Sequence, residues 1–144
     1  MKRAIIILIL AGCAIALGVY LYMFVFGAKH ADPSKSTDKV YITSNELYAL
    51  FSSNEDSANK LYLDKAISVT GKINNLELNE NRYTIYLGTN DSMGSISCEM
   101  DTMQNPVVSK LTVGKEVNVV GFCNGINIDV SLDRCKLENL NPKN

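Results

Sequence analysis

The sequence predicts a mainly β fold: a small five-stranded barrel, a helical segment before it, and a single N-terminal transmembrane helix. Three observations carry this prediction. Nearly all of the first 28 residues form an uncharged apolar run, a polar stretch follows, and in the second half of the chain apolar residues recur at every second position. We therefore divide the 144 residues into an anchor at 1–28, a polar linker at 29–40 and one domain at 41–144.

The N-terminal run has the length and composition of a membrane span. Residues 4–27 contain no charged side chain, and as a helix these 24 residues would extend about 36 Å, enough to cross a hydrocarbon core about 30 Å thick. Lys2 and Arg3 precede the run, and basic residues favour the cytoplasmic side. The sequence therefore predicts a single-pass protein of the bacterial envelope, which contacts the membrane through residues 4–27 and holds its domain outside the cytoplasm.

This run has two other interpretations. A cleaved secretory signal has an apolar core of about 7 to 15 residues and then a small-x-small site, whereas this run is longer and no such site follows it. The residues Leu10-Ala11-Gly12-Cys13 resemble a bacterial lipobox, in which Cys13 would be lipidated. The 14 residues after Cys13 stay uncharged, which favours the uncleaved helix. Lipidation of Cys13 stays open as the alternative, and either arrangement tethers the domain.

The charge of the domain argues against a nucleic-acid partner. After residue 30 the chain carries 11 Lys and Arg against 15 Asp and Glu, a net charge of −4. Proteins that bind nucleic acids gain much of their affinity by neutralising phosphates with clustered Lys and Arg. An acidic domain with scattered basic residues does not fit that requirement.

Helical signals follow the linker. The linker contains His30, the chain's only histidine, which we interpret as solvated. Thr43 and Glu46 fit a capping box at a helix start, and a second short helix is predicted to end near Tyr62. The apolar residues at helical spacing, which we expect to pack against the sheet, are Leu47, Leu50, Phe51, Ala58 and Leu61.

Five strands are predicted in the second half of the chain. Turns are expected at 79–81, at 92–94 and at Asn124-Gly125, and a short helix is expected from Asn105 to Leu111. The apolar residues that alternate within the five strands are Ile67, Val69, Ile73; Tyr83, Ile85, Leu87; Ile96, Cys98, Met100; Val117, Val119; and Ile126, Ile128, Val130, Leu132. Five strands with a small helix between the third and fourth are the element order of the OB fold, a partly open barrel.

Two runs of residues carry a family resemblance. The first begins at Glu46-Leu47 and ends at Val69-x-Gly71, and the second begins at Ser97-Cys98 and ends at Cys135. The most specific piece is Gly121-x-Cys123-x-Gly125, followed by Asp129-Val130-x-Leu132-x-x-Cys135. Together these residues resemble the bacterial tRNA_anti-like family over about residues 41–138. The resemblance implies an OB-type domain behind an N-terminal membrane anchor, and it implies no particular activity.

Three cysteines lie in the domain. The spacing Cys98-x24-Cys123-x11-Cys135 does not fit a zinc site, which normally needs four thiolate or imidazole ligands, so we expect no metal. Outside the cytoplasm disulfides form and persist. A turn at Asn124-Gly125 would place Cys123 and Cys135 about 30 Å apart, whereas the third and fifth strands of an OB barrel are neighbours. Cys98 and Cys135 are therefore the predicted pair, and three buried free thiols are the alternative.

No constellation of residues predicts catalysis. Residues 41–144 contain no histidine and no Gly-rich phosphate loop, so we expect no enzyme activity and no cofactor. OB barrels that bind single strands use aromatic and basic residues on one face, and Lys72, Arg82 and Tyr86 could supply a thin version of such a binding face. The simpler interpretation is that Tyr86 is an ordinary surface residue.

Two functions follow as hypotheses. The first is a membrane-anchored, extracytoplasmic OB-fold binding or adaptor module that is not catalytic and takes a protein or a small ligand. The alternative is a nucleic-acid-binding OB-fold protein tethered on the cytoplasmic side. The two differ in the side of the membrane on which the domain lies.

Overall fold

The computed structural model describes residues 12–20 and 32–138. These residues belong to two separate units, divided between Ala31 and Asp32. Residues 12–20 form a helix in which Cys13 is exposed. None of the helices in the described ranges is long and apolar enough to span a membrane. Most of the predicted transmembrane segment lies outside those ranges.

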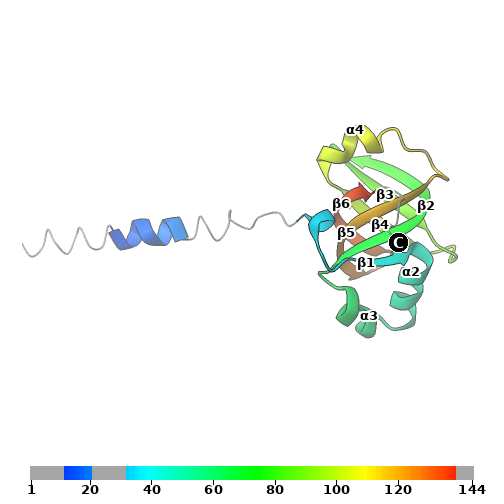
Figure 1. Cartoon of the computed structure of the whole chain (residues 1–144), viewed down its shortest axis with the longest axis horizontal. Helices are drawn as coiled ribbons and strands as arrows, with labels where there is room; N and C mark the ends of the chain where they lie inside the picture. The colour runs from blue at the N-terminus through cyan, green and yellow to red at the C-terminus, as the bar shows by residue number, and fades with distance from the viewer. Residues whose placement is uncertain (1–11, 21–31, 139–144) are drawn as a thin grey trace, which may run out of the picture. The chain divides into compact units, whose positions relative to one another are not determined.

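The second unit is a strand-rich domain with short helices at its two ends. Before the barrel come the 3-10 helix η1 (Pro33–Lys35), the strand β1 (Val40–Thr43) and the helices α2 (Ser44–Ser53) and α3 (Glu55–Tyr62). The barrel strands are β2 (Ala66–Asn79), β3 (Arg82–Gly88), β4 (Ser95–Met100), β5 (Glu116–Ile126) and β6 (Val130–Glu138). Between β4 and β5 lie η2 (Thr102–Gln104) and α4 (Asn105–Val108). Figure 1 shows α2 and α3 at one end of the barrel and α4 at the opposite end.

The five long strands close into a ring. Their order is β2–β3–β4–β6–β5, and a further pairing of β2 with β5 closes the ring. β4 and β6 run parallel, while the other neighbours in the ring are antiparallel. Closure leaves no unpaired edge among these five strands. The prediction of a mainly β, five-stranded barrel preceded by helices is thus confirmed for the described domain.

The helix starts form as their sequences predict. The hydroxyl of Thr43 accepts from the backbone N–H of Glu46 at 3.3 Å, and the Glu46 carboxylate accepts from the N–H of Thr43 at 3.0 Å. This reciprocal pair is the capping box expected at the start of α2. Asn54 caps α3 with a single hydrogen bond, in which its side-chain oxygen accepts from the N–H of Ser57 at 2.9 Å. Two short helices can therefore follow each other with one residue between them.

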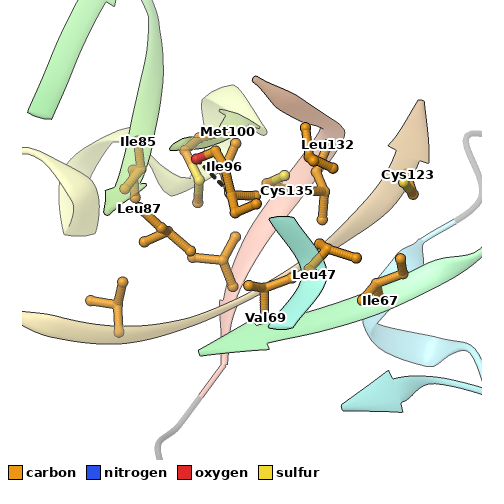
Figure 2. Packing of buried hydrophobic residues seen from close by; sticks show 14 of the residues in the cluster. Leu47, Ile67, Val69, Ile85, Leu87, Ile96, Met100, Cys123, Leu132 and Cys135 are labelled. Carbon is orange, nitrogen blue, oxygen red and sulfur yellow. Dashed lines mark hydrogen bonds between the residues drawn. The ribbon is translucent and has the colours of Figure 1, made fainter. Parts of the chain in front are cut away.

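The core fills the inside of the ring. Alternate residues of each strand point inward, so Ile85 and Leu87 of β3 and Ile96 and Cys98 of β4 are fully buried. Leu47 of α2 is also fully buried in this cluster, where Figure 2 shows it among the strand side chains. The remaining buried side chains of the cluster include Phe51, Ile67, Val69, Ile73, Met100, Val108, Val119, Cys123, Val130, Leu132 and Cys135. The prediction for the helical stripe is thus confirmed for Leu47, Phe51 and Ala58, which are buried in the core. It is wrong for Leu50 and Leu61, which are exposed.

The predicted hairpin turn at Asn124-Gly125 is wrong. β5 continues through both residues to Ile126, and the chain turns at residues 127–129 instead. The register between β5 and β6 shifts between Cys123 and Gly125, and Gly125 has a φ of 91°. The dipeptide thus forms a bulge within the strand, where glycine supplies the left-handed backbone conformation. Because the turn lies at residues 127–129, Cys123 pairs with Leu132, which is three residues before Cys135. The expected separation of about 30 Å between Cys123 and Cys135 is therefore wrong.

The segment from Asp32 to Lys39, which we name the strap, packs on the outside of the barrel. Its helix η1 lies against β2, β5 and β6. There Pro33 is buried, as are Ser68 and Val120, which are register partners on β2 and β5. Two ion pairs hold the strap: Lys136 Nζ lies 2.7 Å from Asp32 Oδ2, and Lys39 Nζ lies 2.6 Å from Glu138 Oε1. The C-terminal strand of the barrel is therefore bound to the residues that precede β1.

We predict that the ion pair of Asp32 makes the stability of the domain depend on pH. The hydrogen bond from Lys136, followed by those from Ser34, lowers the pKa of Asp32 to about 2. Because the folded-state pKa is depressed, the stabilisation is present above about pH 4 and is lost as the pH falls toward 2. Asp32→Asn should lower the free energy of unfolding at pH 6 by about 1 kcal/mol, since the pair is partly solvated.

Urea unfolding of the wild type and of Asp32→Asn between pH 6 and pH 2 checks this prediction. The difference between the two proteins should shrink toward zero at the acidic end. Asp38→Asn is the matched control, because Asp38 lies in the same segment and is exposed. A difference between wild type and Asp32→Asn that does not change with pH would contradict the role of the pair.

Candidate ligand-binding face

The outward residues of three neighbouring strands form a polar surface. Because Ile85, Leu87, Ile96 and Cys98 point into the core, the residues between them point outward. We name this surface the β3 face. It is made by Asn75 and Glu77 of β2, Arg82, Thr84 and Tyr86 of β3, and Ser95, Ser97 and Glu99 of β4, with Asp129 and Ser131 at its border.

The register of the strands arranges the β3 face in rows. One row runs across four strands as Asn75, Tyr86, Ser97 and Ser131. In this row Tyr86 is half-buried and is flanked by small or short polar side chains. Directly paired residues lie about 5 Å apart, so the phenol ring has hydroxyl groups on one side and a carboxamide on the other. The row therefore offers one flat aromatic surface within a set of hydrogen-bonding groups.

The charges of the β3 face are mainly negative. Arg82 is the one cation among the side chains that we assign to this face, and it forms an ion pair with Glu99. Glu77 and Asp129 add two further carboxylates, so three acidic groups stand against one guanidinium. Such a face attracts cationic or hydrogen-bond-donating groups and repels phosphates.

Tyr86 is held by its acidic neighbour. Its hydroxyl donates to Glu77 Oε2 at 3.2 Å. Desolvation, and then this hydrogen bond and the nearby carboxylates of Glu77 and Asp129, raise the pKa of Tyr86 above its ordinary value. The phenol is therefore neutral at physiological pH and keeps its proton for hydrogen bonding.

The two loops beside the β3 face are fixed to the barrel. Asp129 Oδ1, in the loop between β5 and β6, accepts from the backbone N–H of Ser95 at 2.8 Å and from its hydroxyl at 2.7 Å. The loop between β3 and β4 approaches α2 so closely that a Cβ on Gly94 would lie 2.0 Å from the ring of Tyr48. The loops thus give the face a fixed border.

The structure does not gather the three residues predicted for a binding face. Arg82 and Tyr86 lie on the same side of β3, four residues apart, but both have carboxylate partners. Lys72 lies on the half of β2 that pairs with β5, where its register partner is Glu116. The carbonyl of Lys72 lies near Gly88, at the far end of β3, roughly 20 Å of strand from Arg82. A role of these residues in binding stays a prediction.

The cysteines occupy two environments. Cys98, Cys123 and Cys135 are unbonded and fully buried in the barrel, whereas Cys13 is exposed in the helix of residues 12–20. Burial, followed by the neighbouring thiol of Cys98, raises the pKa of Cys135 well above its ordinary value. Burial also raises the pKa of Cys123. The predicted Cys98–Cys135 disulfide and the lipidation of Cys13 both stay predictions.

Glu77 and Glu99 were not singled out from the sequence, and Asp129 was named there only as part of the family resemblance. Counting outward from the turn at Glu80-Asn81 would have paired Glu77 with Thr84, because the hairpin is regular at that end. The contact between Asp129 and Ser95 joins residues 34 positions apart and leaves no local signal. Within the described ranges, no cluster of three or more His, Cys, Asp or Glu residues could hold a metal ion.

Comparisons with known proteins agree on the fold. The family described as tRNA_anti-like has a model that matches residues 1–137. Among curated proteins, no sequence match is found. A solved structure of a proposed nucleic acid-binding lipoprotein from Klebsiella pneumoniae is similar with a TM-score of 0.58 and 17% identity, over 67% of this chain and 91% of that chain.

Two further structures are similar over smaller parts. A proposed aspartyl-tRNA synthetase from Leishmania major has a TM-score of 0.48 and 9% identity, over 72% of this chain and 21% of that chain. The S. pombe Stn1-ten1 complex has a TM-score of 0.41 and 16% identity, over 51% of this chain and 57% of that chain. At 17% identity the likeness to the Klebsiella structure concerns the fold alone.

We predict that Glu77→Gln lowers the pKa of Tyr86. The substitution removes a negative charge beside the phenol, while desolvation remains, so the pKa should fall but stay above the ordinary value. NMR titration of ring-labelled tyrosines, with Tyr86→Phe to assign the signal, measures the change. Glu80→Gln, in the exposed turn of the same hairpin, should leave the pKa unchanged. Equal shifts in the two variants would show that Glu77 and Tyr86 are not in contact.

Proposed function

We propose that this chain, which belongs to the tRNA_anti-like family, is an OB-fold binding or adaptor module that is tethered to a bacterial membrane and lies outside the cytoplasm. The barrel takes a protein or a small ligand on the β3 face and catalyses no reaction. Residues 4–27 form the tether. The family and the barrel are the premises, and the tether, the compartment and the ligand class are the proposal.

The observation that carries the ligand class is the charge of the β3 face. OB barrels that bind oligonucleotides use this same region, the second and third barrel strands with the adjoining loops. They combine stacking aromatics with a positively charged groove that follows the phosphates. Here the aromatic residue is present as Tyr86, but the guanidinium of Arg82 is paired with Glu99, and the carboxylate of Glu77 accepts the hydrogen bond of the Tyr86 hydroxyl. A polyanion is therefore disfavoured, and a polar or cationic surface is favoured.

Two observations support the tether. Residues 4–27 form an uncharged run long enough to cross a bilayer as a helix. The Klebsiella protein with the similar fold is described as a lipoprotein, and lipoproteins are attached to envelope membranes. These two observations support a location at a membrane surface, and Lys2 and Arg3 support the outer side.

One observation favours a second candidate function. The same Klebsiella protein is also described as nucleic acid-binding. If that property extended to this chain, the domain would be a nucleic-acid-binding barrel on the cytoplasmic side. The two candidates make opposite predictions about binding to single strands.

We predict that the full-length chain in detergent does not bind single-stranded DNA or RNA specifically. An oligonucleotide of about 16 nucleotides covers one OB-fold site, and its fluorescence anisotropy should show a Kd weaker than about 10⁻⁴ M at physiological salt. Glu77→Gln with Glu99→Gln releases Arg82 and removes two negative charges, so this variant should bind measurably more tightly. Micromolar binding by the wild type, weakening steeply with salt, would establish the second candidate instead.

We predict that a reporter fused after Asn144 is active only outside the cytoplasm. Fusions to alkaline phosphatase, active after export, and to a fluorescent protein, active in the cytoplasm, measure this directly. Mass analysis of the N-terminus of the wild type and of Cys13→Ala tests lipidation in the same cells. Fluorescence without phosphatase activity would overturn the extracytoplasmic assignment.

A further inference from the structure

We propose that Cys98 and Cys135 are joined by a disulfide bond across β4 and β6 in the exported protein. The compartment in which the bond forms rests on the function proposed above, whereas the choice of the pair rests on the barrel. The structure shows the two thiols in their reduced state. Three features of the barrel bring them together.

The first feature is a bulge in β6. Leu132 is the register partner of Cys98, and Cys135 is the register partner of Met100, so β6 uses three steps where β4 uses two. The φ of Arg134, 50°, marks the extra residue. Because side chains alternate along a strand, this extra residue turns Cys135 back into the core, on the same side as Leu132 and Cys98. Without the bulge the Cys135 side chain would point to solvent.

The second feature is the space that Gly121 leaves on β5. A Cβ at this position would lie 2.5 Å from the Cys135 sulfur and 3.0 Å from the carbonyl oxygen of Asp133. Any larger residue would push the thiol of Cys135 from its place. The third feature is proximity, since the neighbouring thiol of Cys98 contributes to the raised pKa of Cys135 and both side chains are fully buried. Each thiol donates to a carbonyl of its own strand, Cys98 to Ile96 at 3.9 Å and Cys135 to Asp133 at 3.7 Å.

Cys123 is excluded from the pair by its place in the sheet. It is the register partner of Leu132 on β5, and Leu132 is in turn the partner of Cys98 on β4. Strand β6, at Leu132, therefore lies between Cys123 on β5 and Cys98 on β4. Figure 2 shows Cys123 apart from Cys135 as well. One thiol of the three is thus left free inside the barrel.

Formation of the bond needs an external disulfide as oxidant. One cysteine loses its proton, and its thiolate attacks the donor disulfide, which forms a mixed disulfide and releases one donor thiolate. The thiolate of the second cysteine then attacks the protein sulfur of the mixed disulfide, which forms the Cys98–Cys135 bond and releases the other donor thiolate. Two electrons pass to the donor, and the protons of the two cysteines end on the two released thiols. Because both sulfurs are fully buried in the folded barrel, the exchange takes place while the chain folds.

The experiment refolds the full-length chain from urea, with detergent present, into a mixture of reduced and oxidised glutathione. Free thiols are then alkylated, and unreduced peptides are mapped by mass spectrometry. We expect one cross-linked peptide pair that contains Cys98 and Cys135, with Cys123 alkylated. Alkylation of all three cysteines of the domain, or a bond that includes Cys123, would overturn the proposal.

Thermal unfolding gives a second readout. Dithiothreitol should lower the Tm of the oxidised wild type by about 10 °C, because the bond closes a long loop. Cys123→Ala, the control at an equally buried position, should show the same drop, and Cys98→Ala should show none. Equal responses of the two variants would contradict the assigned pair.

The same alkylation in intact cells separates this inference from the proposed function. A bond found both after refolding and in cells supports the inference and the extracytoplasmic location. A bond found after refolding and missing in cells upholds the pair and overturns the location. A bond missing after refolding overturns the pair, and the location is then decided by the reporter fusions alone.

Discussion

The structure depends on one long strand that is shared between three neighbours. The first half of β2 pairs with β5 from Ala66 to Lys72, and part of it also pairs with β1. Its second half pairs with β3, after a register shift between Ile73 and Asn75. The strand can serve both partners because this irregularity bends it, and the bend closes the ring. An unbent β2 would leave an open sheet with two exposed edges.

Closure of the ring determines where the chemistry of the domain lies. Inside, the alternation of side chains collects apolar residues and all three thiols of the domain, so any redox chemistry is confined to the core. Outside, it places Tyr86 among hydroxyls and carboxylates on the β3 face. The strap covers another part of the outer surface, where Ser68 and Val120 are buried. The β3 face is therefore open to a ligand while the strap surface is already occupied by the chain itself.

Much of the fold could be predicted from the sequence because its signals are local. The capping box of Thr43, the turn at Glu80-Asn81 and the alternation around Ile85 each act within a few residues. The turn predicted at Asn124-Gly125 was wrong because this dipeptide occurs both in hairpin turns and in bulges. Only the pairing of β5 with β6 decides between the two structures. The site was harder to predict. Arg82 pairs with Glu99 of β4, and Tyr86 donates a hydrogen bond to Glu77 of β2. Both contacts therefore depend on the register between strands, which no local signal predicts.

The proposed ligand class depends on the sign of the electrostatic potential over the β3 face. NMR relaxation of backbone amides in the presence of small cationic and anionic paramagnetic probes measures that potential residue by residue. We predict that the cationic probe enhances relaxation at Tyr86 and Ser97 more than the anionic probe does, because carboxylates outnumber cations there. A stronger effect of the anionic probe at these residues would show a positive face suited to phosphates and would contradict the proposed ligand class.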